Sequence, residues 1–173
     1  MKSEKKIVKK KRMHTLSVYV SNKPGVLARI SHIFARRGFN IDSLVVSSSL
    51  QGEYSRMTIT AAGSREKLNQ VILQLNKLVD VLHCIEHTGA DSVVREMALT
   101  KVLAESIEER TAVLQIAEHF GAKTVDLTPK SMILMTTGTT EKIDAAVELL
   151  QQFEIVELVR TGSVVMARGG EET

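Results

Sequence analysis

The 173-residue sequence contains one cysteine, two prolines, no tryptophan and only 3% aromatic residues. The single cysteine, Cys84, cannot form an intramolecular disulfide, which argues against a disulfide scaffold and suits a reducing compartment. No apolar run approaches the roughly 20 residues needed to span a bilayer, and the lysine-rich start lacks the apolar stretch of a secretory signal. These absences predict a cytoplasmic chain.

Catalytic and metal-binding patterns are also scarce. The chain has five histidines, and none stands near Cys84 or a carboxylate at the spacing of a zinc site or a nucleophile triad. His83 and His87 could share one face of a strand, but two imidazoles without a third ligand make a poor zinc site. No glycine-rich loop of the P-loop or dinucleotide-binding type occurs. The sequence therefore predicts no catalytic residue, no metal site and no cofactor held by this chain.

The formal charge is distributed unevenly along the chain. The net charge of +3 divides into +6 over residues 1–12 and −3 over the remainder. A basic arm of this kind could touch nucleic acid or a membrane surface, because lysine clusters release counterions from phosphate. The arm has no interleaved glycine or aromatic residue, so we favour a solvated, flexible basic tail over residues 1–12.

Strand-like alternation and helical periodicity follow each other in a regular order. Apolar residues alternate with polar ones from Met13 to Val20, as in a strand with one buried face, and recur at three and four positions from Val26 to Phe34, as on an amphipathic helix. Gly38 supplies a left-handed helix end. The next predicted element is a hairpin of the strands Ile41–Leu50 and Tyr54–Ala61, joined by a turn at Gln51–Gly52. A helix capped by Ser64 and a fourth strand, Val79–Glu86, follow it.

The same order returns after a break at Thr88–Asp91, where glycine and small polar residues gather. Its predicted segments are the strand Val93–Leu103, a helix ended by Gly121, a turn at Pro129, the strand Met132–Thr137, a helix capped by Thr140, and the strands Ile155–Val159 and Val164–Ala167. We expect an α+β chain with two tandem ferredoxin-like βαββαβ domains, residues 13–88 and 89–173. Edge pairing in a symmetric dimer would protect the exposed strands and build a ligand cleft.

The segment Asn22–Leu27 joins the first predicted strand to the first predicted helix. The first N–H groups of a helix have no internal partner and attract anions, and Gly25 would let a ligand approach the backbone. Asn22 can add an amide that bonds a carboxylate or an ammonium group. The structural alternative is that these residues only begin the helix and bind no ligand, with Pro24 at the first helical position. A carboxylate-binding site and an ordinary helix start both fit this segment by itself.

Several short strings resemble, in order, the small subunits of acetolactate synthase, whose first half is an amino-acid-binding ACT domain. The strings of the first half are Leu16–Val20, Asn22–Leu27, Arg37–Leu44, Ser55–Ile59 and Lys77–Val81. Those of the second half are Arg95–Leu99, Val125–Thr128 and Arg160–Gly162. The resemblance covers about Met13 to Arg168, and the basic tail lies outside it.

The resemblance implies a regulatory subunit that is not an enzyme on its own. Such a subunit is a homodimer that binds valine or a related branched-chain amino acid for feedback inhibition. It also activates a separate catalytic (large) subunit in valine, leucine and isoleucine biosynthesis. Thiamine diphosphate, Mg and FAD are expected in that catalytic partner.

Carried over by motif, the resemblance also implies a set of effector-binding residues in the ACT regulatory domain, residues 13–88. The set is Asn22, Gly25, Val26, Leu27, Asn40 and Ile41. The two asparagines would supply polar contacts across a dimer interface, the backbone from Gly25 to Leu27 would receive the carboxylate, and Ile41 would form part of an apolar wall. In the second half, Glu108 and Glu109 open the corresponding helix without a Pro-Gly pair, so no equivalent site is expected there.

Four other functions share parts of this pattern. An ACT-type sensor for another biosynthetic enzyme would use the same site. An RNA-recognition module has the same order of elements, but it stacks bases on aromatic residues of its central strands, and Tyr54 is the only aromatic residue between Gly52 and Thr60. An independent enzyme is disfavoured because no acid, base and nucleophile set can be assembled, and a purely structural scaffold also fits the pattern.

Overall fold

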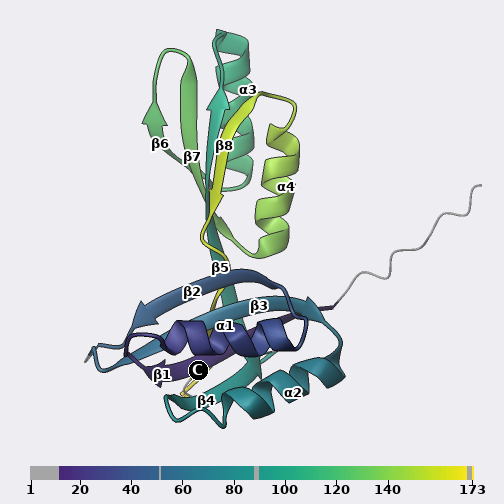
Figure 1. Ribbon diagram of the computed structural model, residues 1–173. Coiled ribbons are helices and arrows are strands. Elements are labelled where there is room, and N and C mark those ends of the chain that lie inside the picture. The colour runs from purple at the N-terminus through teal and green to yellow at the C-terminus, as the bar shows by residue number, and fades with distance from the viewer. Residues whose placement is uncertain (1–11, 51, 88–89, 171–172) are drawn as a thin grey trace, which may run out of the picture. The chain divides into compact units, whose positions relative to one another are not determined.

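The computed structural model describes residues 12–50, 52–87, 90–170 and 173, which form two compact units (Figure 1). The first unit ends at Glu86 and the second begins at His87, with the short run Ser43–Val46 grouped with the second. The predicted basic tail up to residue 11, Gln51 of the predicted turn and Thr88–Gly89 of the predicted boundary lie outside the described residues. No helix in the described ranges is long and apolar enough to cross a membrane.

The first unit is a four-stranded sheet with two helices. Its elements in chain order are β1 (Arg12–Ser21), α1 (Val26–Arg36), β2 (Ile41–Ser48), β3 (Tyr54–Gly63), α2 (Arg65–Leu75) and β4 (Val81–His87). The strand order is β2-β3-β1-β4, so β1 and β3 lie at the centre and pair antiparallel, with Leu16 opposite Ile59 and Val18 opposite Met57. This is the predicted βαββαβ arrangement, in which the first and third strands are neighbours.

The core of the first unit follows the predicted periodicities. Leu16, Val18 and Val20 are fully buried along β1, and Figure 1 shows α1 and α2 side by side against one face of the sheet. Burying such a side chain stabilises the fold by about 1.5–3 kcal/mol relative to leaving it exposed. The buried residues of the two helices are Val26, Ile30 and Phe34 of α1 and Leu68, Val71 and Leu75 of α2.

Most predicted boundaries of the first unit are confirmed to within two residues. Gly38 follows α1 with a φ of 67°, the left-handed conformation that glycine adopts without strain. Ser64 is the residue before α2, as predicted, but its side chain makes no capping hydrogen bond. The prediction that the fourth strand starts at Val79 is wrong, because Val79 lies fully exposed in a turn and β4 begins at Val81.

The second unit repeats the order of the first. Its elements are β5 (Ser92–Leu103), α3 (Ile107–His119), β6 (Lys123–Leu127), β7 (Ser131–Gly138), α4 (Thr140–Leu150), β8 (Ile155–Arg160) and β9 (Val164–Ala167). The strand order β6-β7-β5-β8 matches that of the first unit, and β9 adds to the amino-terminal part of β5, with Ser92 opposite Ala167. The expected pair of ferredoxin-like units is therefore confirmed.

The predicted cap of α4 is off by one residue. The residue before the helix is Thr139, and its hydroxyl accepts a hydrogen bond from the Lys142 N–H. Thr140 is the first helical residue, and its hydroxyl instead donates to the Glu96 carboxylate over 3.0 Å. Two adjacent threonines are equally good caps by residue type, so the sequence could not separate them.

An ion-pair network ties α4 to the sheet of the second unit. The Arg160 guanidinium donates from Nε and Nη2 to the two oxygens of Glu96, at 2.5 and 3.0 Å, and from Nη1 to Asp144 of α4 at 2.6 Å. Hydrogen bonding to Glu96 is the main cause that raises the pKa of Arg160. The Glu96 side chain is only 5% exposed. Since Glu96 is nearly buried, removal of either partner would leave a charge poorly solvated.

We predict that Glu96→Gln destabilises the second unit. The substitution keeps the side-chain shape but removes the charge that three donors meet, and a hydrogen bond to a charged group contributes about 1.5–3 kcal/mol. Urea unfolding followed by far-UV circular dichroism should show a loss of this size.

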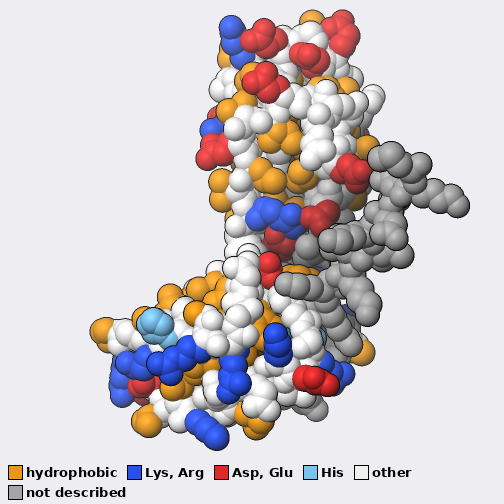
Figure 2. Space-filling view, turned by 45° about the vertical axis from the view of Figure 1, so that its right-hand side comes forward, with side chains coloured by type: hydrophobic (Ala, Val, Ile, Leu, Met, Phe, Trp, Pro, Cys, Tyr) orange, Lys and Arg blue, Asp and Glu red, His pale blue; other side chains and the backbone are white. Residues whose placement is uncertain are grey.

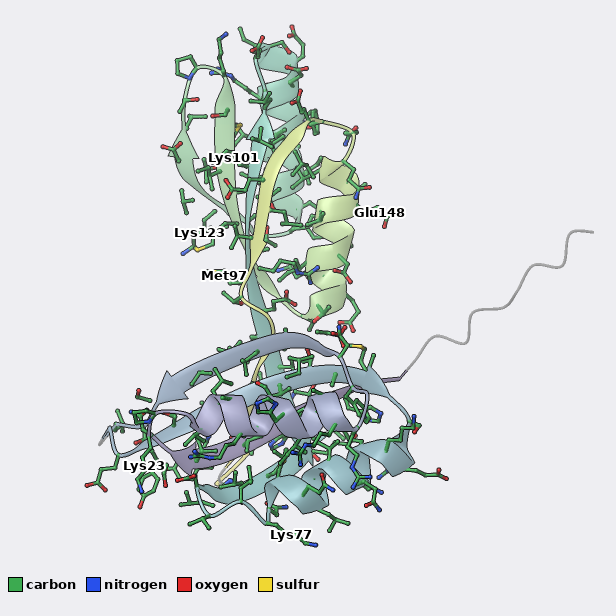
Figure 3. All side chains as sticks on the ribbon, viewed as in Figure 1. Lys23, Lys77, Met97, Lys101, Lys123 and Glu148 are labelled. Carbon is green, nitrogen blue, oxygen red and sulfur yellow. The ribbon has the colours of Figure 1, made fainter. Side chains whose placement is uncertain are left out.

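The matched control is Glu157→Gln on the neighbouring strand β8. Glu157 pairs with Lys101 (labelled in Figure 3), and both side chains are well exposed, at 57% and 37%. An exposed pair contributes about 0–1 kcal/mol, so the control should unfold almost as the parent does. Equal effects of the two substitutions would contradict a structural role for the Glu96 network.

Candidate functional site

The loop between β1 and α1 ends at a left-handed glycine. Gly25 has a φ of 81° and directly precedes α1, which begins at Val26. Pro24 therefore lies two residues before Val26. It does not occupy the first helical position, where an ordinary helix start without a ligand would place it. The first turn of α1 contains no acidic residue, so its N–H groups meet no carboxylate of their own turn and attract anions.

Two adjacent residues just before β3 hold this loop in place on one side. The Asn22 N–H donates to the Glu53 carbonyl over 2.8 Å, and Asn22 Nδ2 donates to the Gly52 carbonyl over 3.0 Å. The predicted polar residue is thus exposed but oriented, because its amide nitrogen is bound to the chain. Its Oδ1 is the atom that can accept a hydrogen bond from a ligand ammonium group.

Asp80 holds the loop from the opposite side. Its carbonyl accepts from the Ser21 N–H over 2.8 Å, and its carboxylate accepts from Arg29 Nη2. Arg29 in turn donates its backbone N–H to the Gly25 carbonyl over 3.1 Å. The analysis of the sequence missed both residues as site residues. The available signal was the spacing of four between Gly25 and Arg29, which places both on one face of the helix start.

The second predicted segment lies at the other end of α1. Phe39 is buried and its ring meets Phe34 edge to face at a centroid distance of 6.4 Å. Its ring also occupies the space that a Cβ at Gly63 would need. Asn40 is exposed and Ile41 is half-buried at the start of β2. Phe39 therefore anchors the segment, and Asn40 lies exposed beside it.

One chain does not bring the six predicted residues together. Asn22, Gly25, Val26 and Leu27 lie at the amino-terminal end of α1, whereas Asn40 and Ile41 follow its carboxyl-terminal end. The 11 residues of α1 separate the two groups by about 16 Å at a rise of about 1.5 Å per residue. Lys23, labelled in Figure 3, marks the loop at the amino-terminal end. The Val26 side chain is buried in the core, so only its backbone can serve the site.

The start of α3 in the second unit differs from the start of α1. Ser106 and Glu109 form a reciprocal capping box, in which the Glu109 carboxylate accepts from the N–H groups of Ser106 and Glu105. These hydrogen bonds, the one from Ser106 first, lower the pKa of Glu109. The α3 helix therefore carries its own carboxylate where α1 has none.

Charge also distinguishes the two units. Residues 13–87 contain eight Lys or Arg and five Asp or Glu, whereas residues 90–170 contain eight and twelve. Figure 2 shows Lys and Arg side chains gathered on the face of the first unit that it presents, and Asp and Glu side chains on that of the second. The anion-attracting helix start thus belongs to the more basic unit, which favours an anionic ligand there.

Side chains with other possible chemistry have structural surroundings. Burial raises the pKa of the Cys84 thiol to about 12, so it stays protonated and unreactive near neutral pH. His14 is buried and its Nδ1 lies 2.7 Å from Glu86, a pairing between strands that sequence spacing did not reveal. The described residues contain no group of three or more His, Cys, Asp or Glu that could hold a metal ion.

The sheet of the first unit carries a small aromatic cluster, the feature that RNA-recognition modules use. Tyr19 lies 5.4 Å from both Tyr54 and His83, and the Arg56 guanidinium lies 5.5 Å from the Tyr19 ring centroid. Tyr19 and Tyr54 are half-buried. Because three neighbours surround the Tyr19 ring, it has little free face on which a base could stack.

Comparisons with known proteins agree over most of the chain. Residues 16–83 match the family model of the AHAS small subunit-like ACT domain, and residues 95–169 match that of the small subunit of acetolactate synthase. The probable acetolactate synthase small subunit of Methanothermobacter thermautotrophicus is 44% identical over 90% of this chain and 93% of its own length.

Two further relatives support the same assignment. The acetolactate synthase small subunit of Mycolicibacterium smegmatis is also 44% identical, over 90% of this chain and 91% of its own length. The crystal structure of the acetolactate synthase small subunit from Thermotoga maritima superposes with a TM-score of 0.83 at 36% identity, covering 92% of this chain and 99% of that one. Since both sequence and fold match over nearly the full length, the chain belongs to the family of acetolactate synthase small subunits.

Proposed function

We propose that this chain is a regulatory subunit that binds a branched-chain amino acid, with valine as the favoured effector, at the amino-terminal end of α1. The observation that carries the proposal is the acid-free helix start at Gly25, framed by Asn22 and Arg29, inside a unit that matches an ACT domain. An amino acid presents a carboxylate and an ammonium group together. The helix N–H groups suit the carboxylate, and asparagine oxygens suit the ammonium group.

The apolar part of the effector would lie against Leu27 and Ile41. Leu27 is 40% exposed next to the helix start, although leucine side chains are commonly buried. A pocket wall of this kind distinguishes branched aliphatic side chains only weakly, since one methylene changes binding by about 1–3 kcal/mol. The geometry therefore supports the class of branched-chain amino acids, and family membership favours valine within it.

We further propose that two copies complete the site. A two-fold axis perpendicular to α1 would place the amino-terminal end of one helix beside the carboxyl-terminal end of its partner. That arrangement brings Asn22 and Gly25 of one copy close to Asn40 and Ile41 of the other. The separation of these groups within one chain supports a homodimer formed through residues 13–88.

The chemical step would belong to the catalytic subunit of acetolactate synthase. We expect thiamine diphosphate, Mg and FAD in that subunit, and we expect the complex to lie in the cytoplasm. Our chain would activate that subunit and transmit the effector signal to it. An effector shifts a conformational equilibrium only as far as it binds one state better than the other. A sensor for a different biosynthetic enzyme would use the same site, and only reconstitution with the catalytic subunit separates these two functions.

The first prediction concerns the oligomeric state. Because each chain holds half of the proposed site and its sheet has edge strands to protect, we expect a dimer with twice the monomer mass of 19.1 kDa. Sedimentation equilibrium in the presence of valine measures this directly. A monomer over the whole accessible concentration range would contradict the shared site.

A second prediction concerns activity. The purified chain should form no acetolactate by itself, but it should increase turnover when mixed with its catalytic subunit. The measurement is acetolactate formation by the two components apart and together. Product from rigorously partner-free protein, or no change on mixing, would overturn the proposed division of roles.

A third prediction concerns Gly25→Asp, which should abolish feedback inhibition and leave activation largely intact. The new carboxylate would lie at the helix N–H groups, and a Cβ at this position comes within 3.4 Å of Arg29 Nη1. The variant would therefore fill the anion site with its own charge. Titration of the reconstituted complex with valine, with acetolactate as the readout, tests this.

The control for Gly25→Asp is Gly121→Asp, which follows α3 in the second unit. Gly121 is also left-handed, with a φ of 61°, and a Cβ there meets nothing within 4 Å. It imposes similar backbone strain away from the site, so inhibition should stay normal. Normal inhibition of a folded Gly25→Asp complex would rule out this site.

Asn22→Ala should act more mildly than Gly25→Asp, raising the half-inhibiting concentration of valine about ten- to over a hundredfold.

A further inference from the structure

The ion pair between Arg29 and Asp80 lies beside the proposed effector site, and its two side chains differ in exposure. The Arg29 side chain is 47% exposed but the Asp80 side chain only 19%. Asp80 is therefore the fixed partner, held in the turn before β4, and Arg29 is the partner that reaches toward solvent. An arginine carries five N–H donors, and one carboxylate oxygen occupies only one of them here.

The free part of the guanidinium lies over Gly25. Apart from the chain neighbours Pro24 and Val26, Arg29 Nη1 is the only atom of the described residues within 4 Å of a Cβ built on Gly25, at 3.4 Å. A ligand that approaches the bare backbone of Gly25 would therefore meet this nitrogen. Since no other described side chain beyond those two neighbours comes this close, the guanidinium is the side chain best placed to contact such a ligand.

Asp80 fixes this arrangement at two points. Its backbone carbonyl holds Ser21 at the start of the loop, and its carboxylate holds Arg29 one turn into α1. The two contacts lie on either side of Asn22–Gly25. Asp80 thus couples the position of the loop backbone to the orientation of the guanidinium.

We propose that Arg29 is the side chain that recognises the effector carboxylate, and that Asp80 is the positioning residue that holds its guanidinium over Gly25. The inference rests on the proposed function of the loop. The carboxylate would be bound by helix N–H groups on one side and by Nη1 on the other. A charge-assisted contact of this kind is roughly twice as strong as a neutral hydrogen bond, so it favours amino acids over uncharged molecules of the same shape.

The experiment measures valine binding to the full-length dimer by calorimetry for Arg29→Gln, Arg29→Lys and Asp80→Asn. Arg29→Gln removes the cation and should raise Kd about ten- to over a hundredfold. Arg29→Lys keeps the cation and should recover most of that loss. Asp80→Asn keeps the cation but loosens its orientation, so we expect a smaller rise of about fivefold.

The matched control is Arg65→Gln, which removes an exposed arginine from α2 of the same unit and should leave Kd unchanged. Urea midpoints of all variants separate binding from folding. Parent-like binding by Arg29→Gln, or an Arg29→Lys variant as weak as Arg29→Gln, would overturn this inference while the proposed site stands. A parent protein that binds neither valine, leucine nor isoleucine would overturn the proposed function and this inference with it.

Discussion

The left-handed backbone at Gly25 is the constraint on which the functional part of the first unit depends. A φ of 81° turns the chain sharply from β1 into α1, and the first turn of that helix carries no acidic residue. The loop is held by Glu53 and Gly52 on one side and by Asp80 on the other. Donors held in a fixed orientation bind an anion with little reorganisation, because that orientation exists before the ligand arrives.

The second unit shows what happens when the same topology lacks this constraint. Its strands follow the same order, but α3 is preceded by Ser106 in extended backbone, and the Glu109 carboxylate accepts from the N–H groups of Ser106 and Glu105. That cap stabilises α3 and removes its capacity to attract an external carboxylate. With the proposed effector site, two copies of one fold would differ in function through a few residues at one helix start, in line with the general rule that function belongs to sites and not to folds.

Periodicity predicted most of this architecture, because strand alternation and helical stripes are local signals that burial reinforces. The contacts that escaped prediction join residues far apart in sequence: Arg29 with Asp80 across 51 residues, Arg160 with Glu96 across 64, and His14 with Glu86 across 72. Charge pairs have no period, so only the folded sheet reveals them. The family resemblance marked the strings that contain Asp80, Glu96 and Arg160, but it could not show that the last two strings meet.

In the proposed dimer, charge links effector binding to the association of the two copies. The carboxyl-terminal end of α1 carries Arg36 and Arg37, and its amino-terminal end carries Arg29. Pairing two α1 helices head to tail would therefore gather cationic side chains at each site, and like charges oppose close approach. An effector whose carboxylate lies between these cations, with its ammonium group on the asparagine oxygens, would relieve this repulsion. The effector would then stabilise the state in which the copies lie closest, and a change in their spacing is a signal that a catalytic partner bound to both can read.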